Sequence, residues 1–105
     1  MTDSEDRSYG SILGAFIGDS IGQYLEFELG VQSKERVDKG MSMPGGGTWN
    51  LAPGQCTDDS ELAMCQLRGL VEGDGILNTA SIAKYYGQWF ADGPFDIGGT
   101  CRKGI

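Results

Sequence analysis

Histidine is absent from this 105-residue sequence, and cysteine and proline are scarce, with three of each. Without histidine the chain lacks the usual general base and the commonest zinc ligand. Any catalysis must therefore use carboxylates, hydroxyls, thiols or a bound metal ion. Cys56, Cys65 and Cys101 form no Cys-x-x-Cys pair, and their odd number is typical of reduced thiols in a cytosolic protein.

Positive charge and long apolar runs are also limited. Lysine and arginine number 8 against 15 aspartates and glutamates, for a formal net charge of −7. Because an acidic surface repels phosphate backbones, we expect no nucleic-acid partner. No apolar run is long enough to span a membrane, and the acidic residues 1–7 lack the apolar segment of a signal peptide. The prediction is a soluble, cytoplasmic protein with no membrane partner.

Glycine, in contrast, is abundant, with 18 residues. Within a helix, glycine costs about 1 kcal/mol relative to alanine, so this content argues against a self-sufficient helical domain. We infer that the glycines have specific roles and that part of the core is missing. The length allows one domain and is too short for two. We therefore expect a single partial domain over residues 1–105, with residues 1–7 as a disordered polar tail.

The first predicted helix runs from Ser8 to about Leu29. Its apolar positions follow a helical period and are Ile12, Leu13, Phe16, Ile17, Ile21, Leu25 and Phe27. Glycines recur at every fourth residue on one narrow stripe, at Gly10, Gly14, Gly18 and Gly22. The stripe is either a flexible, weakened segment or a groove in which another helix packs closely against the backbone.

The rest of the chain is predicted to be two helices joined by glycine- and proline-rich loops. Residues 30–56 show no period and form a long loop, of the kind that is functional or disordered. A helix follows from Thr57, whose hydroxyl can cap it, to a stop near Gly73. Another helix follows Asn78, and residues 95–100 form a glycine-rich turn. We interpret the aromatic stripe of the helix after Asn78 as core packing. Its members are Ile82, Tyr85, Tyr86, Trp89 and Phe90. The fold class is all-α.

The strongest local signal for chemistry is Thr57-Asp58-Asp59-Ser60-Glu61, directly after the long loop. Two adjacent carboxylates between hydroxyls offer only hard oxygen ligands, which suit Mg²⁺ or Mn²⁺. The same residues also suit a simple helix start, because acidic side chains are favourable in the first turn. These residues alone leave both interpretations open.

Other carboxylates lie in glycine-rich surroundings. Asp19 precedes Glu26 by seven residues, so both would share one face of the predicted helix. A carboxylate on a buried face needs a partner, such as a metal-bound water or substrate, whereas a solvated helix edge needs none. Asp96 lies in a turn whose N–H groups could hold phosphate, although an ordinary Asx turn is the preferred explanation of this motif taken alone.

Three motifs together resemble the ADP-ribosylglycohydrolase family over about residues 8–101. They are Gly14-x-x-x-Gly18-Asp19-Ser20-x-Gly22-x-x-x-Glu26, then Pro53-Gly54-Gln55-x-Thr57-Asp58-Asp59-Ser60-Glu61-Leu62-Ala63, then Phe95-Asp96-Ile97-Gly98. The resemblance implies the N-terminal portion of an all-α fold around two Mg²⁺ or Mn²⁺ ions. It implies metal ligands at Thr57, Asp58 and Asp59. It implies catalytic roles for Glu26 and Asp96. Substrate contacts are implied at Gly45, Gly46, Gly98 and Gly99.

The function implied by this resemblance is metal-dependent hydrolysis of the glycosidic bond between ADP-ribose and a protein side chain or small acceptor. Such a reaction builds oxocarbenium character and needs an activated water, which metal ions can supply without histidine. The family's C-terminal Asp-x-Asp-Thr-like motif does not occur in this sequence. We therefore expect a fragment that is weakly active or inactive alone. The alternative is a non-catalytic relative that binds ADP-ribose or acts structurally.

Overall fold

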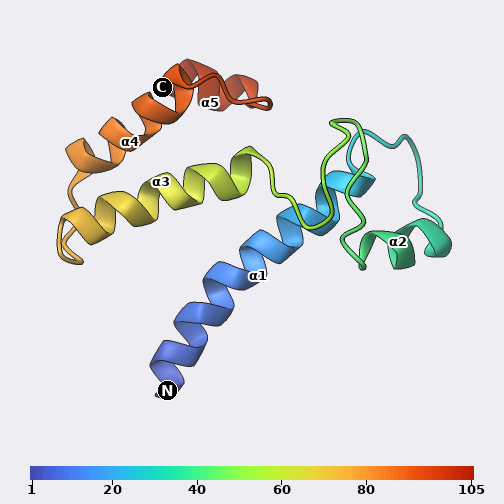
Figure 1. Cartoon of the computed structure of the whole chain (residues 1–105), viewed down its shortest axis with the longest axis horizontal. Coiled ribbons are helices and arrows are strands. Elements are labelled where there is room, and N and C mark those ends of the chain that lie inside the picture. Colours follow the sequence, from blue (N-terminus) through green and yellow to red (C-terminus); the bar gives the residue numbers. More distant parts are fainter. The chain divides into compact units, whose positions relative to one another are not determined.

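The computed structural model describes all 105 residues and confirms the all-α class (Figure 1). It contains five helices, which are α1 Asp3–Leu25, α2 Lys34–Gly40, α3 Asp58–Glu72, α4 Thr79–Ala91 and α5 Gly99–Gly104. The β-structure is limited to one isolated bridge between Gly46 and Leu51. None of the helices has the length and apolar character needed to cross a membrane. Within the predicted single domain, the chain forms two compact units, Met1–Thr57 and Asp58–Ile105.

Helix α1 begins at Asp3, where the sequence analysis expected a disordered tail over residues 1–7. A capping box explains this early start. The Thr2 hydroxyl accepts from the Glu5 backbone N–H at 3.2 Å, and the Glu5 carboxylate accepts from the Thr2 N–H at 2.7 Å. These hydrogen bonds from Thr2 also lower the pKa of Glu5. The tail prediction is therefore wrong from Asp3 onward, because the polar residues satisfy the helix start.

Helix α1 ends at Leu25, which is earlier than the predicted end near Leu29. Glu26 is extended, with φ −64° and ψ 147°, and Phe27 has a φ of +64°. Phe27 and Leu29 are 64% and 97% exposed, so they do not extend the apolar face of the helix. The predicted helix was too long because Phe27 and Leu29 are apolar residues of an irregular segment and happen to continue the helical spacing.

The core of the first unit lies at the C-terminal end of α1. Ser20 and Gln23 are the buried residues of this helix. Gly47, with a φ of +71°, lies so close that a Cβ there would be 2.8 Å from Gln23 Oε1. Helix α2 occupies part of the predicted loop, because Ser33 caps it by accepting from the Arg36 N–H at 3.2 Å. This short helix was not predicted, since residues 30–56 show no sustained apolar period.

The stripe of glycines on α1 is open. A Cβ built at Gly10, Gly14, Gly18 or Gly22 meets no heavy atom within 4 Å. Leu13 and Ile17 in the same helix are 54% and 46% exposed. The first unit therefore supplies no helix that packs against this stripe.

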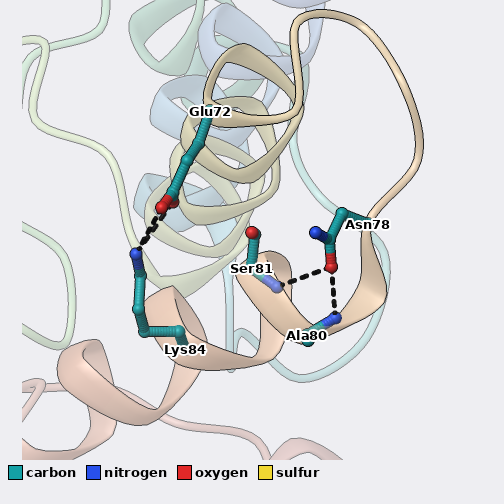
Figure 2. Close-up of polar contacts among 5 residues, drawn as sticks. All are labelled: Glu72, Asn78, Ala80, Ser81 and Lys84. Carbon is teal, nitrogen blue, oxygen red and sulfur yellow. Dashed lines mark hydrogen bonds and ion pairs between the residues drawn. The ribbon is translucent and has the colours of Figure 1, made fainter.

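In the second unit, α3 and α4 pack against each other as an antiparallel helix pair, and α5 follows them (Figure 1). As predicted, α3 stops before Gly73 and α4 follows Asn78. Figure 2 shows the Asn78 side chain accepting from the Ala80 and Ser81 backbone N–H groups, at 3.1 and 3.2 Å. These local signals were correct because a cap acts within one turn.

Close packing in the second unit occurs where α3 meets α4. A Cβ at Gly69 would lie 2.5 Å from Ile82 Cγ1 and 2.9 Å from Ile82 Cα. Cys65 and Ile82 are the buried hydrophobic residues, at 4% and 8% exposure. Helix α5 begins inside the segment predicted as a glycine-rich turn, with Gly98 at its N-cap. That part of the turn prediction was wrong.

Candidate functional site

Thr57 is held against helix α1 by a carboxylate that lies 38 residues earlier in the chain. The Thr57 backbone N–H donates to Asp19 Oδ2 at 2.8 Å, and the Thr57 hydroxyl donates to Asp19 Oδ1 at 2.6 Å. Thr57 is 2% exposed. The predicted need of Asp19 for a partner is thus met by Thr57. No local sequence signal connects these two residues, which lie 38 positions apart.

Asp58 is connected to the segment that precedes α5. The Gly98 backbone N–H donates to Asp58 Oδ2 at 3.2 Å, which joins residues 40 positions apart. The structure therefore brings together a predicted metal ligand, Asp58, and a predicted substrate contact, Gly98. In this arrangement the Gly98 N–H is directed at a carboxylate. Asp58 is half-buried, and the next residue, Asp59, is exposed.

Glu26 and Asp96 lie in different units of the chain. Glu26 is the first residue after α1, is exposed and has an extended backbone. The prediction that Asp19 and Glu26 share a helix face is wrong, because the backbone leaves the helix at Glu26. Asp96 is half-buried in the irregular segment between α4 and α5. Their predicted catalytic roles stay predictions.

Gly45 and Gly46 belong to a tight loop that closes on residues 51–53. A Cβ at Gly45, which has a φ of +74°, would be 2.4 Å from the Leu51 carbonyl oxygen. Gly46 and Leu51 exchange two backbone hydrogen bonds, at 2.7 and 3.0 Å. The geometry of this loop thus explains the glycine at position 45 without a ligand. Substrate contacts at Gly45 and Gly46, and at Gly99 at the start of α5, stay predictions.

The donor set of Thr57, Asp58 and Asp59 suits a hard divalent cation. All side-chain donors are oxygens, which Mg²⁺ and Mn²⁺ prefer. The hydroxyl of Thr57 gives its hydrogen to Asp19, so the lone pairs of its oxygen can face an ion. No group of three or more histidine, cysteine, aspartate or glutamate side chains gathers in a metal-binding arrangement.

A groove between α3 and α4 was not anticipated from the sequence. It encloses about 270 Å³ and is lined by Glu61, Met64, Cys65, Arg68, Tyr85, Gln88, Trp89 and Asp92. The Trp89 indole N–H donates to Glu61 Oε2 at 2.6 Å. Burial raises the pKa of the Cys65 thiol, an effect that nearby Arg68 opposes. The aromatic stripe of α4 is therefore only partly core, since Phe90 is 39% exposed.

The comparison with known protein families gives one match over the whole chain. Residues 1–105 match the family model described as ADP-ribosylglycohydrolase. Residues 8–101, which carry the three motifs, lie within this match.

Individual relatives are consistent with that match. The chain is 37% identical over 100 residues to the ADP-ribosyl-[dinitrogen reductase] glycohydrolase of Rhodospirillum rubrum, an alignment that covers 95% of this chain and 34% of the relative. It is 35% identical over 96 residues to the ADP-ribosylarginine hydrolase Tri1 of Pseudomonas putida, covering 91% of this chain and 24% of that protein. For Tri1 of Serratia proteamaculans, identity is 32% over 111 residues, with coverages of 99% and 29%. The chain spans about a third or less of the length of these curated relatives.

Proposed function

The chain belongs to the ADP-ribosylglycohydrolase family, and from this premise we propose that it contributes to the hydrolysis of an ADP-ribose glycosidic bond. The proposed substrate is an ADP-ribosylated protein or a small ADP-ribose conjugate. The names of the Rhodospirillum and Pseudomonas relatives specify dinitrogen reductase and arginine as the modified partners, which supports a protein conjugate. The proposal includes two Mg²⁺ or Mn²⁺ ions and a cytoplasmic location.

The observation that carries the proposal is the run of oxygen donors at the start of α3. Thr57, Asp58 and Asp59 are consecutive, and the first turn of a helix directs successive side chains to different sides. Adjacent carboxylates can therefore face different ions. Hydrogen bonds to Asp19 and Gly98 hold two of the three side chains in defined orientations. Each of these side chains is oriented within its own unit, and an oriented side chain loses less entropy when it binds an ion.

Each remaining site residue has a proposed role in this reaction. When bound, divalent ions supply an activated water and orientation of the ribose hydroxyls. Glu26 would accept the proton of the attacking water, and Asp96 would orient the leaving group or the ADP-ribose. Gly45 and Gly46 would border the ADP-ribose cleft. Gly98 and Gly99 would lie against the phosphates, where the absence of a side chain allows close approach.

The second candidate function is a non-catalytic relative that binds ADP-ribose or acts structurally. It is favoured by the partial donor set, because no group of three or more acidic, cysteine or histidine side chains gathers in this chain. The two candidates differ in turnover. A binding protein retains ADP-ribose affinity without releasing product, whereas a hydrolase cleaves the bond.

Calorimetric titration of ADP-ribose into the purified 105-residue chain, with and without Mg²⁺ or Mn²⁺, tests the proposal. We expect metal-dependent binding that Asp58→Asn and Asp59→Asn each weaken. Turnover assays on peptides modified at arginine or serine would then separate the hydrolase from the binding protein. Metal-independent binding, or binding unaffected by both substitutions, would contradict a metal site at these residues.

A further inference from the structure

The Asp19 carboxylate contacts Thr57 through both of its oxygens. One carboxylate oxygen accepts the backbone N–H at 2.8 Å, and the other accepts the hydroxyl at 2.6 Å. The first bond fixes the backbone of Thr57, and the second fixes its side-chain rotamer. Together they determine where the lone pairs of the Thr57 oxygen point.

The hydroxyl bond has a specific chemical consequence. A neutral hydroxyl that binds a cation must place its hydrogen away from the ion, and a carboxylate is a strong acceptor for it. The carboxylate also increases the electron density on the hydroxyl oxygen through this hydrogen bond. Groups that orient metal ligands in this way typically change metal affinity by about 10–100-fold when they are removed.

Asp19, which holds Thr57, lies in a part of α1 that is packed within the first unit. Asp19 is next to Ser20 in α1, and Ser20 is 2% exposed. The residue before Thr57 is also connected to this helix, since the Cys56 Sγ donates to the Phe16 carbonyl oxygen at 3.5 Å. Both contacts hold the end of the long loop against α1. The position of Thr57 is therefore determined by a regular helix rather than by the loop alone.

We propose that Asp19 is a positioning residue for a divalent cation bound at Thr57, Asp58 and Asp59, acting through the Thr57 hydroxyl. This inference rests on the proposed function. Asp19 does not contact the ion in this scheme. It holds the hydroxyl hydrogen and leaves the oxygen lone pairs for the metal.

The test is Mn²⁺ affinity, measured by the electron paramagnetic resonance of free Mn²⁺ in titrations of the full 105-residue chain. Asp19→Asn retains the size of the side chain but can accept strongly from only one of the two Thr57 donors. We expect it to weaken Mn²⁺ binding about tenfold. Asp74→Asn, which removes the same charge from the exposed turn after α3, should leave the affinity unchanged.

A double-mutant cycle separates positioning from general destabilisation. Thr57→Val removes the hydroxyl and keeps the backbone N–H. If Asp19 acts through the hydroxyl, Asp19→Asn will weaken binding much less in the Thr57→Val background. Thermal unfolding without metal records the structural contribution of the same bonds. Asp19→Glu serves the same test if Asp19→Asn does not fold.

The outcomes distinguish this inference from the proposed function. Loss of affinity in Asp58→Asn together with unchanged affinity in folded Asp19→Asn would overturn the positioning role alone. Equal losses from Asp19→Asn in the parent chain and in the Thr57→Val background would also overturn it. Mn²⁺ binding that Asp58→Asn and Asp59→Asn leave unaltered would overturn the metal site and the positioning role together.

Discussion

Glycine has opposite roles in the two units of this chain. In α1, four glycines at regular spacing face open space, and Leu13 and Ile17 of the same helix are about half exposed. In α3, the single glycine at position 69 lies against Ile82 of α4, with no room for a methyl group. The periodic pattern thus has no packing partner in its unit, whereas the isolated glycine does. Spacing alone does not reveal which glycine is needed for close approach.

Substitution of Gly69 should produce the largest effect on stability. In Gly69→Ala, the added methyl would lie 2.5 Å from Ile82 Cγ1 and 2.9 Å from its Cα, so the two helices must separate. We expect a loss of about 2–3 kcal/mol in the free energy of unfolding, measured by chemical denaturation. Gly87→Ala in α4 is the control, because nothing lies within 4 Å of that position. Equal stability of both variants would show that the helices are not in close contact at Gly69.

Removal of the Trp89 hydrogen bond should have the next largest effect. Trp89→Phe keeps an aromatic ring but leaves Glu61 without the indole N–H donor that lies at 2.6 Å. We expect a loss of about 1–2 kcal/mol, from urea unfolding followed by circular dichroism. Glu61→Gln retains an oxygen acceptor and should lose less. A Trp89→Phe chain as stable as the parent would mean that solvent replaces this bond without cost.

Alanine in place of a glycine of the open α1 stripe should increase the stability of the chain, in contrast to Gly69→Ala. Gly14→Ala places a methyl group where no heavy atom lies within 4 Å, and alanine favours a helix over glycine. We expect a gain of up to about 1 kcal/mol in the free energy of unfolding and a slightly stronger overall helical signal, both measured by circular dichroism. A loss of stability would instead show that another surface covers this face in solution, which would remove the contrast with Gly69.

The smallest effect should come from the exposed ion pair between α3 and α4. Lys84 Nζ lies 2.8 Å from Glu72 Oε1 (Figure 2). The pair lowers the pKa of Glu72 from 4.5 and raises that of Lys84 from 10.5. Its contribution is therefore lost as the pH falls through the lowered Glu72 pKa, and as the pH rises through the raised Lys84 pKa.

Lys84→Met measures that contribution. The parent chain should melt slightly higher than the variant from the ordinary pKa of a glutamate up to the ordinary pKa of a lysine. The difference should vanish below the lowered pKa of Glu72 and above the raised pKa of Lys84. Added salt should reduce the difference, because both side chains are accessible to solvent. A melting difference that stays constant through acid pH would mean that the lysine stem, rather than its charge, stabilises the helix pair.

The sequence predictions were mostly correct where a signal acts between residues that are neighbours in the chain. Asn78 and Gly73 correctly marked helix boundaries, because caps and stops involve neighbouring residues. The capping box of Thr2 and Glu5 was equally local, but the acidic composition of the N-terminus obscured it. The end of α1 was placed too late, because Phe27 continued an apolar period after the backbone had left the helix.

The candidate site shows the same division. The run Thr57-Asp58-Asp59 was identifiable from its oxygen donors and from the motifs around it, and the family match covers these residues. The partner of Thr57 was not identifiable, although Asp19 was noted as a carboxylate that needs one. Many polar groups could have met that need, and only the path of the long loop selects Thr57.

The sequence by itself determined the helical class, the boundaries of α3 and α4, and the chemistry of the donor atoms. These properties depend on residue type and on interactions within a turn or two of the chain. The tertiary structure decided which donors are oriented, by joining Asp19 to Thr57 and Gly98 to Asp58 across 38 and 40 residues. It also decided that Gly69 lies at a helix contact of its unit, whereas the stripe glycines of α1 meet no helix within theirs. Such pairings depend on which surfaces meet when the chain folds, and no local pattern encodes that choice.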